Sequence, residues 1–338
     1  MTHVTEIKNN ILEFCIMVKS EIISWLLDGD VSVQYLVQRD LLGNDDTELR
    51  NRISAEGWGR YYLEARNKRG HWGQDYYQPK WISTHYTLLD LKQLNIDPHH
   101  PDIKKIVDEV LENEKGPDGG ILPIGTVKKC DVCVNGMALN FLTYFGAKEE
   151  GLQSVVDFIL SEKMPDGGFN CQSNRKGAIH SSMHTTISVL EGFFEFLKNG
   201  YKYKAQEIEN AMNSSIEFLL MHQLFKSDKT GEVIHPNFLK LYYPSRWYYD
   251  ILRAMDFFQY ADVPFDHRMN DALRVLISKK TKEGVWKLAS PHSGKVHINM
   301  EKAGQQSRWN TLRALRVLKK YHSDFFTNYK HHHATTNR

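Results

Sequence analysis

Zinc-ligand residue types recur at one position of a repeated helix start. The triplets Ser83-Thr84-His85, Asp131-Val132-Cys133 and Ser182-Met183-His184 each open an apolar helical pattern. A thiolate and imidazoles are ligands that zinc prefers, and three protein ligands with an open fourth position are typical of a catalytic zinc site. The three third residues therefore predict a Zn²⁺ site. Taken singly, a buried cysteine and two histidines at helix starts are the alternative interpretation.

Three further triplets belong to the same series, namely Ser32-Val33-Gln34, Ser245-Arg246-Trp247 and Ser307-Arg308-Trp309. The third residues of the six triplets are separated by 51, 48, 51, 63 and 62 positions. Such spacing is typical of a repeat architecture. Serine and aspartate are preferred N-cap residues, so each third residue is predicted at the second position of a helix. Capping alone also explains Asp131.

A second set of amphipathic stretches alternates with the triplets, at 4–27, 45–66, 102–114, 150–163, 204–223 and 267–280. Their apolar residues recur at three- and four-residue spacing and their other faces are charged, which predicts outer helices. Glycine-bearing turns such as Asp166-Gly167-Gly168-Phe169 connect them to the more apolar inner helices. The predicted fold is all-α, an (α/α)6 toroid of residues 1–328 followed by a tail at 329–338.

Parallel inner helices would bring their N-termini to one mouth of the toroid. Helix N-termini carry partial positive charge and favour anions such as a diphosphate. Basic residues predicted near this mouth are Lys80, Lys128, Arg246 and Arg308. The aromatic residues Trp81, Tyr86, Trp247 and Trp309 fall in the same region and are predicted to line an isoprenoid pocket. Core packing is an equally good explanation for any single ring.

Composition excludes several classes of protein. The net charge of +2 with 25% charged residues gives no bias toward nucleic acid. No stretch approaches the ~18 apolar residues of a membrane helix, and charged residues interrupt the N-terminal segment, so no signal peptide is expected. Four cysteines in 338 residues do not make a disulfide scaffold. These features predict a reduced, cytoplasmic protein.

The triplets and glycine turns together resemble the superfamily of prenyltransferase β-subunits and terpene cyclases, and also bacterial proteins that carry such repeats. Asp131-x-Cys133 followed by His184-Thr185 is similar to the zinc triad of protein prenyltransferase β-subunits. The resemblance implies zinc on Asp131, Cys133 and His184, and implies that Lys128 contacts diphosphate. His85 would then be a fourth ligand or an acid–base group. Cys130, Cys171 and water are the other candidates for the fourth ligand, and the two cysteines rank below Cys133 because neither falls at the repeated position.

The sequence also departs from this superfamily. The tyrosine that follows the metal cysteine in prenyltransferases is Val134 here, and the Asp-x-Asp-Asp acid of squalene–hopene type cyclases is absent. A protonation-initiated cyclase is therefore not expected. Protein prenyltransferase β-subunits work with an α-subunit. A partner subunit is possible here, but nothing in this sequence supports one.

Three functions remain open at this stage. The first is a zinc-dependent, prenyltransferase-like enzyme that acts on an isoprenoid or other anionic small molecule. The second is a zinc-stabilised binding module for an isoprenoid or lipid. The third is a zinc hydrolase or lyase for a small anionic metabolite. A long aromatic tunnel would favour prenyl chains, whereas a polar cup would favour small metabolites.

Overall fold

Helices dominate the computed structural model, which describes residues 20–124, 128–172 and 177–322. Strands β1 (Trp286–Lys287) and β2 (Gln306–Ser307) form a short antiparallel pair. The prediction of an all-α fold is confirmed. The predicted tail at 329–338 and most of the predicted helix at 4–27 lie outside the described residues.

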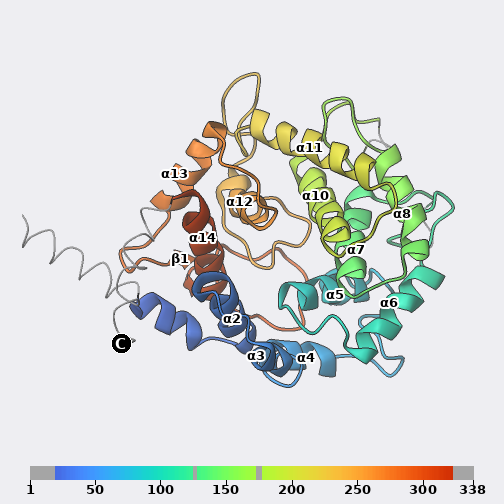
Figure 1. Ribbon diagram of the computed structural model, residues 1–338, viewed down its shortest axis with the longest axis horizontal. Helices are drawn as coiled ribbons and strands as arrows, with labels where there is room; N and C mark the ends of the chain where they lie inside the picture. The colour runs from blue at the N-terminus through green and yellow to red at the C-terminus, as the bar shows by residue number, and fades with distance from the viewer. Residues whose placement is uncertain (1–19, 125–127, 173–176, 323–338) are drawn as a thin grey trace, which may run out of the picture.

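A set of largely buried helices lies around the centre of the molecule (Figure 1). These inner helices are α2 (Val31–Leu36), α5 (Thr84–Gln93), α7 (Val132–Tyr144), α10 (Met183–Lys198), α12 (Ile251–Tyr260) and α14 (Arg308–Tyr321). In α7, every residue from Val134 to Thr143 is buried. A helix that is buried on all sides belongs to the interior of a domain, as the apolar composition of this segment predicts.

Amphipathic helices lie outside the inner set, and the two sets together form the circular arrangement expected of an α/α toroid (Figure 1). The outer helices are α3 (Thr47–Arg52), α4 (Gly57–Glu64), α6 (Pro101–Asn113), α8 (Glu149–Ser161), α11 (Ala205–Met221) and α13 (Asn270–Ser278). On α6, Ile103, Ile106, Val107 and Val110 face the core at helical spacing. The predicted helices at 102–114, 150–163 and 204–223 are confirmed.

Short helical turns complete the fold. A π-helical turn at Val37–Leu42 continues α2, and 3-10 turns lie at Lys80–Ile82, Pro236–Leu239 and His267–Met269. The last of these turns leads into α13, so the predicted helix at 267–280 is confirmed with a tighter first turn.

The predicted outer helix at 45–66 is wrong as a single element, because it divides into α3 and α4. Gly57 begins α4 with a φ of +56°, a conformation that residues with a side chain rarely adopt. A Cβ at this position would lie 2.0 Å from Asp30 Oδ2. The same carboxylate accepts the Trp58 N–H at 2.8 Å, which holds the break in place.

An apolar residue after four of the glycine-bearing turns packs into the wall of the ring. Trp72, Ile121, Phe169 and Trp286 are all fully buried. The backbone N–H of each one donates to a side chain near the start of an inner helix, respectively Thr84, Asn135, Thr186 and Thr311. Val233 is the exception, because it is 41% exposed and plugs nothing.

Four of the six triplets open their helices as predicted. His85, Cys133, His184 and Trp309 each occupy the second position of an inner helix. The other two predictions are wrong, because Asp30 and Asp250 cap α2 and α12 in place of Ser32 and Ser245. Ser307 caps α14 through its hydroxyl, whereas Ser83, Asp131 and Ser182 hold the cap position without a side-chain cap bond.

Candidate functional site

Five of the predicted substrate-binding residues gather beside the start of α5. Lys80 Nζ lies 4.9 Å from the centre of the Trp81 ring and 5.1 Å from that of Trp247. The Arg246 guanidinium lies 5.0 Å from the Trp81 ring and 5.7 Å from the Tyr86 ring. We call this group of residues the aromatic mouth.

The segment between β1 and β2 packs across the aromatic mouth. Trp81 Nε1 donates to the Ser293 carbonyl at 2.6 Å, and the His292 ring stacks on Tyr248 with centroids 3.3 Å apart. Trp81 is 4% exposed and Tyr86 is fully buried. These contacts favour core packing for both rings.

Arg246 is held in a buried ion pair. Its Nη2 lies 3.3 Å from Asp90 Oδ2, and its Nη1 donates to the Trp81 carbonyl at 3.2 Å. Asp90 is 1% exposed and also accepts a hydrogen bond from the Tyr62 hydroxyl. Because its charge is already matched, Arg246 stabilises the mouth more readily than it would hold an anionic ligand.

His85 lies inside an aromatic shell. Its Nδ1 is 2.7 Å from the Tyr76 hydroxyl, and the rings of Tyr77, Tyr86 and Phe141 contact it. Burial lowers the pKa of His85 to about 3, so the imidazole is neutral at pH 7. Among the described residues, Nε2 has no hydrogen-bond partner.

Cys133 and Cys171 are neighbours at the start of α7. The Cys133 backbone N–H donates to Cys171 Sγ at 2.9 Å, and the Thr185 hydroxyl donates to the same sulfur at 3.4 Å. The thiol of Cys133 also hydrogen-bonds to Cys171, which lowers the pKa of Cys171 and raises that of Cys133. Asp131 is close enough to act on both thiols electrostatically.

His184 is turned away from these sulfurs toward other partners. Its Nδ1 accepts the Tyr249 backbone N–H at 2.7 Å, and its ring packs against Trp247 and Phe238. A neutral imidazole that accepts through Nδ1 carries its proton on Nε2. Neither nitrogen therefore has a lone pair available for a metal in this arrangement.

The predicted metal residues do not come together as a metal site in the described part of the chain. No three His, Cys, Asp or Glu side chains are grouped there in a way that could hold a metal ion. Zinc on Asp131, Cys133 and His184 remains a prediction. It would require His184 to give up its bond to the Tyr249 N–H.

The other predicted site residues lie elsewhere. Arg308 is outside the aromatic mouth, where its guanidinium lies 4.7 Å from the Trp25 ring and Nε donates to the Trp25 carbonyl. Lys128 is exposed in the loop before α7. Trp309 stacks on Tyr243 with ring centroids 4.2 Å apart and lines a cavity that the sequence analysis did not predict.

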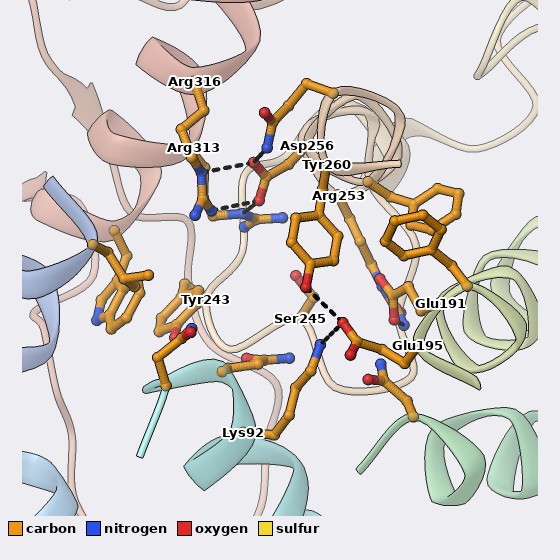
Figure 2. Close-up of a pocket in the computed structure, with 18 of the residues that line it drawn as sticks. Lys92, Glu191, Glu195, Tyr243, Ser245, Arg253, Asp256, Tyr260, Arg313 and Arg316 are labelled. Atoms are coloured by element: carbon orange, nitrogen blue, oxygen red, sulfur yellow. Dashed lines mark hydrogen bonds and ion pairs between the residues drawn. The ribbon is translucent and has the colours of Figure 1, made fainter. Parts of the chain in front are cut away.

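This central cavity has a volume of about 140 Å³ and draws its lining from all the inner helices. Figure 2 shows side chains from several helices surrounding it. The lining residues are Leu36, Arg39, Lys92, Gln93, Asn95, Asn140, Tyr144, Glu191, Phe194, Glu195, Tyr243, Ser245, Arg253, Asp256, Phe257, Gln259, Tyr260, Trp309, Arg313 and Arg316. Most of them lie in the C-terminal halves of their helices, so the cavity is at the end opposite to the helix starts.

Ion pairs connect the cavity walls (Figure 2). Asp256 accepts from Arg313 at 3.2 Å and from Arg316 at 2.8 Å, and Arg316 continues to Asp40. From the same helix α12, Arg253 makes a two-point pair with Glu191 of α10 at 2.9 and 2.7 Å. These contacts hold α10, α12 and α14 at fixed positions around the cavity.

Lys92 and Glu195 form a third pair at 2.9 Å, and the Tyr260 hydroxyl donates to Glu195 at 2.8 Å. Although burial acts in the opposite direction, the Lys92 ammonium lowers the pKa of Glu195. Five cationic and three acidic side chains line the cavity. The excess of cations offsets the partial negative charge of the helix C-termini that end there.

Several polar atoms in the lining are not satisfied. Gln93 Oε1, Asn140 Oδ1, Tyr243 OH and Trp309 Nε1 are buried and have no hydrogen-bond partner among the described residues. Leaving a buried donor or acceptor unsatisfied costs about 1–3 kcal/mol. Four such groups belong to residues that line one cavity, where water or another polar molecule could supply the missing bonds.

A sequence signal for the cavity exists, seven residues beyond the triplets. Lys92, Asn140, Glu191 and Arg316 each follow the third residue of a triplet by seven positions. Seven residues are two helical turns, so both positions lie on the same face, roughly 10 Å apart along the axis. In four of the six repeats the inward face therefore carries a polar residue at this second level, whereas Leu41 and Ala254 hold the position in the other two.

Comparisons with known proteins support the fold and go no further. No family model and no curated protein matches the sequence. The chain is similar to the solved structure of a polysaccharide lyase, with a TM-score of 0.50 and 11% identity over 90% of this chain and 96% of that one. An apo type II terpene cyclase from Scytonema aligns with a TM-score of 0.33 and 14% identity over 80% and 96% of the two chains.

The TM-score of the cyclase alignment is too low to support an argument, and the identity to the lyase is low enough to show the fold alone. Within the described ranges, every helix is too short or too polar to span a bilayer. The chemistry of the aromatic mouth and the central cavity must therefore decide the function.

Proposed function

We propose that this protein binds a small hydroxylated anion, such as a hydroxy acid or a sugar acid, in the central cavity of an (α/α)6 toroid. The observation that carries the proposal is the set of unsatisfied polar atoms in the cavity lining. Gln93 and Asn140 offer acceptors, Trp309 offers a donor and Tyr243 can serve as either. A ligand with several hydroxyl groups has both donors and acceptors to offer to these atoms.

Two cations have hydrogen-bonding capacity left for an acidic group. Arg313 uses Nε on Asp256 and Nη1 on the Tyr242 carbonyl, and its Nη2 has no acceptor among the described residues. The ammonium of Lys92 carries three donors and is paired only with Glu195 in the described part of the chain. A carboxylate between these two cations would gain charge-assisted hydrogen bonds.

The same lining disfavours an isoprenoid. Charged side chains that are buried against a hydrocarbon chain lose hydration without gaining a partner, which is costly. The cavity therefore resembles the polar cup that favours small metabolites. We do not propose zinc-dependent prenyl transfer, because the lone pairs of His184 are not available to a metal.

The polysaccharide lyase gives a useful first set of ligands to test, although it shares only the fold with this chain. Sugar acids combine a carboxylate with several hydroxyl groups, which matches the donors and acceptors in the lining. Whether the bound molecule is also transformed depends on an acid or base near neutral pKa. Burial raises the pKa of Tyr243, and the pKa of Glu195, a carboxylate in the lining, is lowered. Both shifts move these groups away from neutral pKa, so the cavity supports binding more strongly than proton transfer.

Calorimetric titration with D-glucuronate, D-gluconate, D-glucose and farnesyl diphosphate tests the proposal. We expect the two acids to bind more tightly than glucose, and Lys92→Gln to weaken their binding at least tenfold, or about 1.4 kcal/mol. Lys105→Gln is the matched control, because the Lys105 side chain is 77% exposed on α6. It should leave the affinity unchanged.

Two results would contradict the proposal. One is farnesyl diphosphate binding more tightly than either acid, which would return the function to prenyl chemistry. The other is equal affinity in wild type and Lys92→Gln when circular dichroism shows that both are folded.

A further inference from the structure

We propose that Cys133 and Cys171 form a reactive dithiol that exchanges with small disulfides such as oxidised glutathione. This site is separate from the central cavity and does not depend on the function proposed there. Cys171 is the residue that attacks, and Cys133 is the one that resolves.

The two cysteines come from different repeats and meet through direct contacts. The Cys133 N–H lies 2.9 Å from Cys171 Sγ, so the Cα of Cys133 is at most about 4.4 Å from that sulfur. A disulfide requires Cα atoms within about 7 Å, which this contact allows with little movement of the backbone.

The sulfur of Cys171 is placed to act as the nucleophile. It accepts from a free backbone N–H in the first turn of α7 and from the Thr185 hydroxyl in the first turn of α10. Hydrogen bonds to a sulfur at helix N-termini stabilise its anionic form, which is the form that reacts. The backbone N–H of Cys133 donates to this sulfur, so Cys133 is the cysteine best placed to displace it later.

Access distinguishes this pair from the third described cysteine. As residues, Cys133 and Cys171 are partly exposed, although burial of their sulfurs acts to raise the pKa of both thiols, whereas Cys130 is a fully buried residue. Exposure together with a resolving partner is the usual setting of a redox-active thiol. The alternative use of these sulfurs, as zinc ligands, would exclude the reaction because the metal would occupy them.

The reaction proceeds in two balanced steps. Cys171, after losing its proton to solvent, attacks one sulfur of oxidised glutathione, and one glutathione thiolate leaves. The deprotonated Cys133 then attacks Cys171 Sγ, the intramolecular disulfide forms, and the second glutathione thiolate leaves. The two protein thiols are oxidised, and oxidised glutathione is reduced to two glutathione molecules that take up the two released protons.

Mass spectrometry of the full chain after incubation with oxidised glutathione at pH 7.5 tests this mechanism. Wild type should lose two hydrogens, and peptide mapping should show a Cys133–Cys171 disulfide. Cys133→Ser should stop after the first step and retain one glutathione on Cys171. Cys171→Ser cannot form the intramolecular disulfide. Glutathione should add to its Cys133 more slowly than it adds to Cys171 in Cys133→Ser. Cys130→Ala is the control and should behave as wild type.

Three outcomes would overturn the proposal. The first is a wild-type protein whose Cys133 and Cys171 stay reduced under excess oxidised glutathione. The second is a disulfide that joins either residue to Cys15 or Cys130 instead. The third is equally fast glutathione addition to Cys133 in Cys171→Ser, which would show that the hydrogen bonds to Cys171 do not direct the attack.

Discussion

The aromatic mouth and the central cavity lie toward opposite ends of the same inner helices and accommodate buried polar groups in opposite ways. At the mouth, aromatic rings surround the polar groups. His85 stays neutral among Tyr76, Tyr77 and Phe141, and Arg246 is paired with Asp90. At the cavity, several ion pairs line one open space, as the pair of Arg253 and Glu191 does. The comparison shows that one repeated frame can build an aromatic, packed end and a hollow end lined by ion pairs.

The difference has a physical origin in how each end is closed. The segment between β1 and β2 packs over the mouth, so side chains there are shielded from water and their charged forms are penalised. The cavity has space for polar molecules, and its ion pairs satisfy one another across α10, α12 and α14. The three predictions that follow probe this contrast.

The largest effect is expected from removing a cation of the cavity. Arg253→Met leaves Glu191 without its partner and removes hydrogen bonds to Ser188 and the Tyr248 carbonyl, so the free energy of unfolding should fall by about 3 kcal/mol. Urea denaturation measures this change. Arg60→Met is the control, because Arg60 and Glu64 form an exposed pair on α4, and it should cost less than ~0.5 kcal/mol.

Equal losses in the two variants would mean that the cavity pairs are no more important to stability than surface pairs. The distinction between the two ends would then rest on shape alone.

A smaller effect is expected from pH at the mouth. The pKa of His85 is about 3 in the folded protein and about 6.5 when unfolded, so only the unfolded chain takes up this proton between those values. The contribution of neutral His85 to the free energy of unfolding is fully present above pH 6.5 and is lost as the pH falls below that value. Between pH 7 and pH 5, His85 should therefore lower the free energy of unfolding by about 2 kcal/mol.

Urea denaturation of wild type and His85→Gln at both pH values isolates this contribution. The variant should lose less stability than wild type over the interval, whatever its stability at pH 7. Identical losses would show that His85 takes up its proton as readily in the folded protein as in the unfolded chain.

The smallest effect concerns two tyrosines of the cavity and has opposite signs. Tyr243→Phe removes a buried hydroxyl that lacks a partner among the described residues, so stability should rise by about 1 kcal/mol. Tyr260→Phe removes a hydroxyl that donates to Glu195, so stability should fall by about 1 kcal/mol. Thermal denaturation without added ligand compares the two.

A drop in stability for Tyr243→Phe would indicate that its hydroxyl already has a partner, such as ordered water. The unsatisfied lining would then be a weaker indication of a ligand.

The sequence predicted the inner and outer helices well because their signals are local. Periodicity on α6 and α7 and the apolar plugs at Trp72 and Phe169 depend on residues a few positions apart. The prediction failed where a distant residue intervened. Asp30 reaches Gly57 and divides one outer helix into two, and no local pattern in 45–66 reveals that contact.

The candidate site was predicted only in part for the same reason. The triplets correctly placed Cys133, His184 and His85 at helix starts, but their neighbours came from other segments. Cys171 lies 38 positions from Cys133, and Tyr249 lies 65 positions from His184. These partners decide whether a sulfur reacts and whether an imidazole can bind a metal.

By itself, the sequence determined the repeated frame, the alternation of buried and amphipathic helices, and the inward face that carries Lys92, Asn140, Glu191 and Arg316 seven residues beyond the triplets. Helical periodicity fixes these features because it depends on spacings of three, four and seven residues. Only the tertiary structure decided which charges meet. Arg316 and Asp40 are 276 positions apart, and their pairing depends on closure of the ring, which brings α14 beside the segment that follows α2.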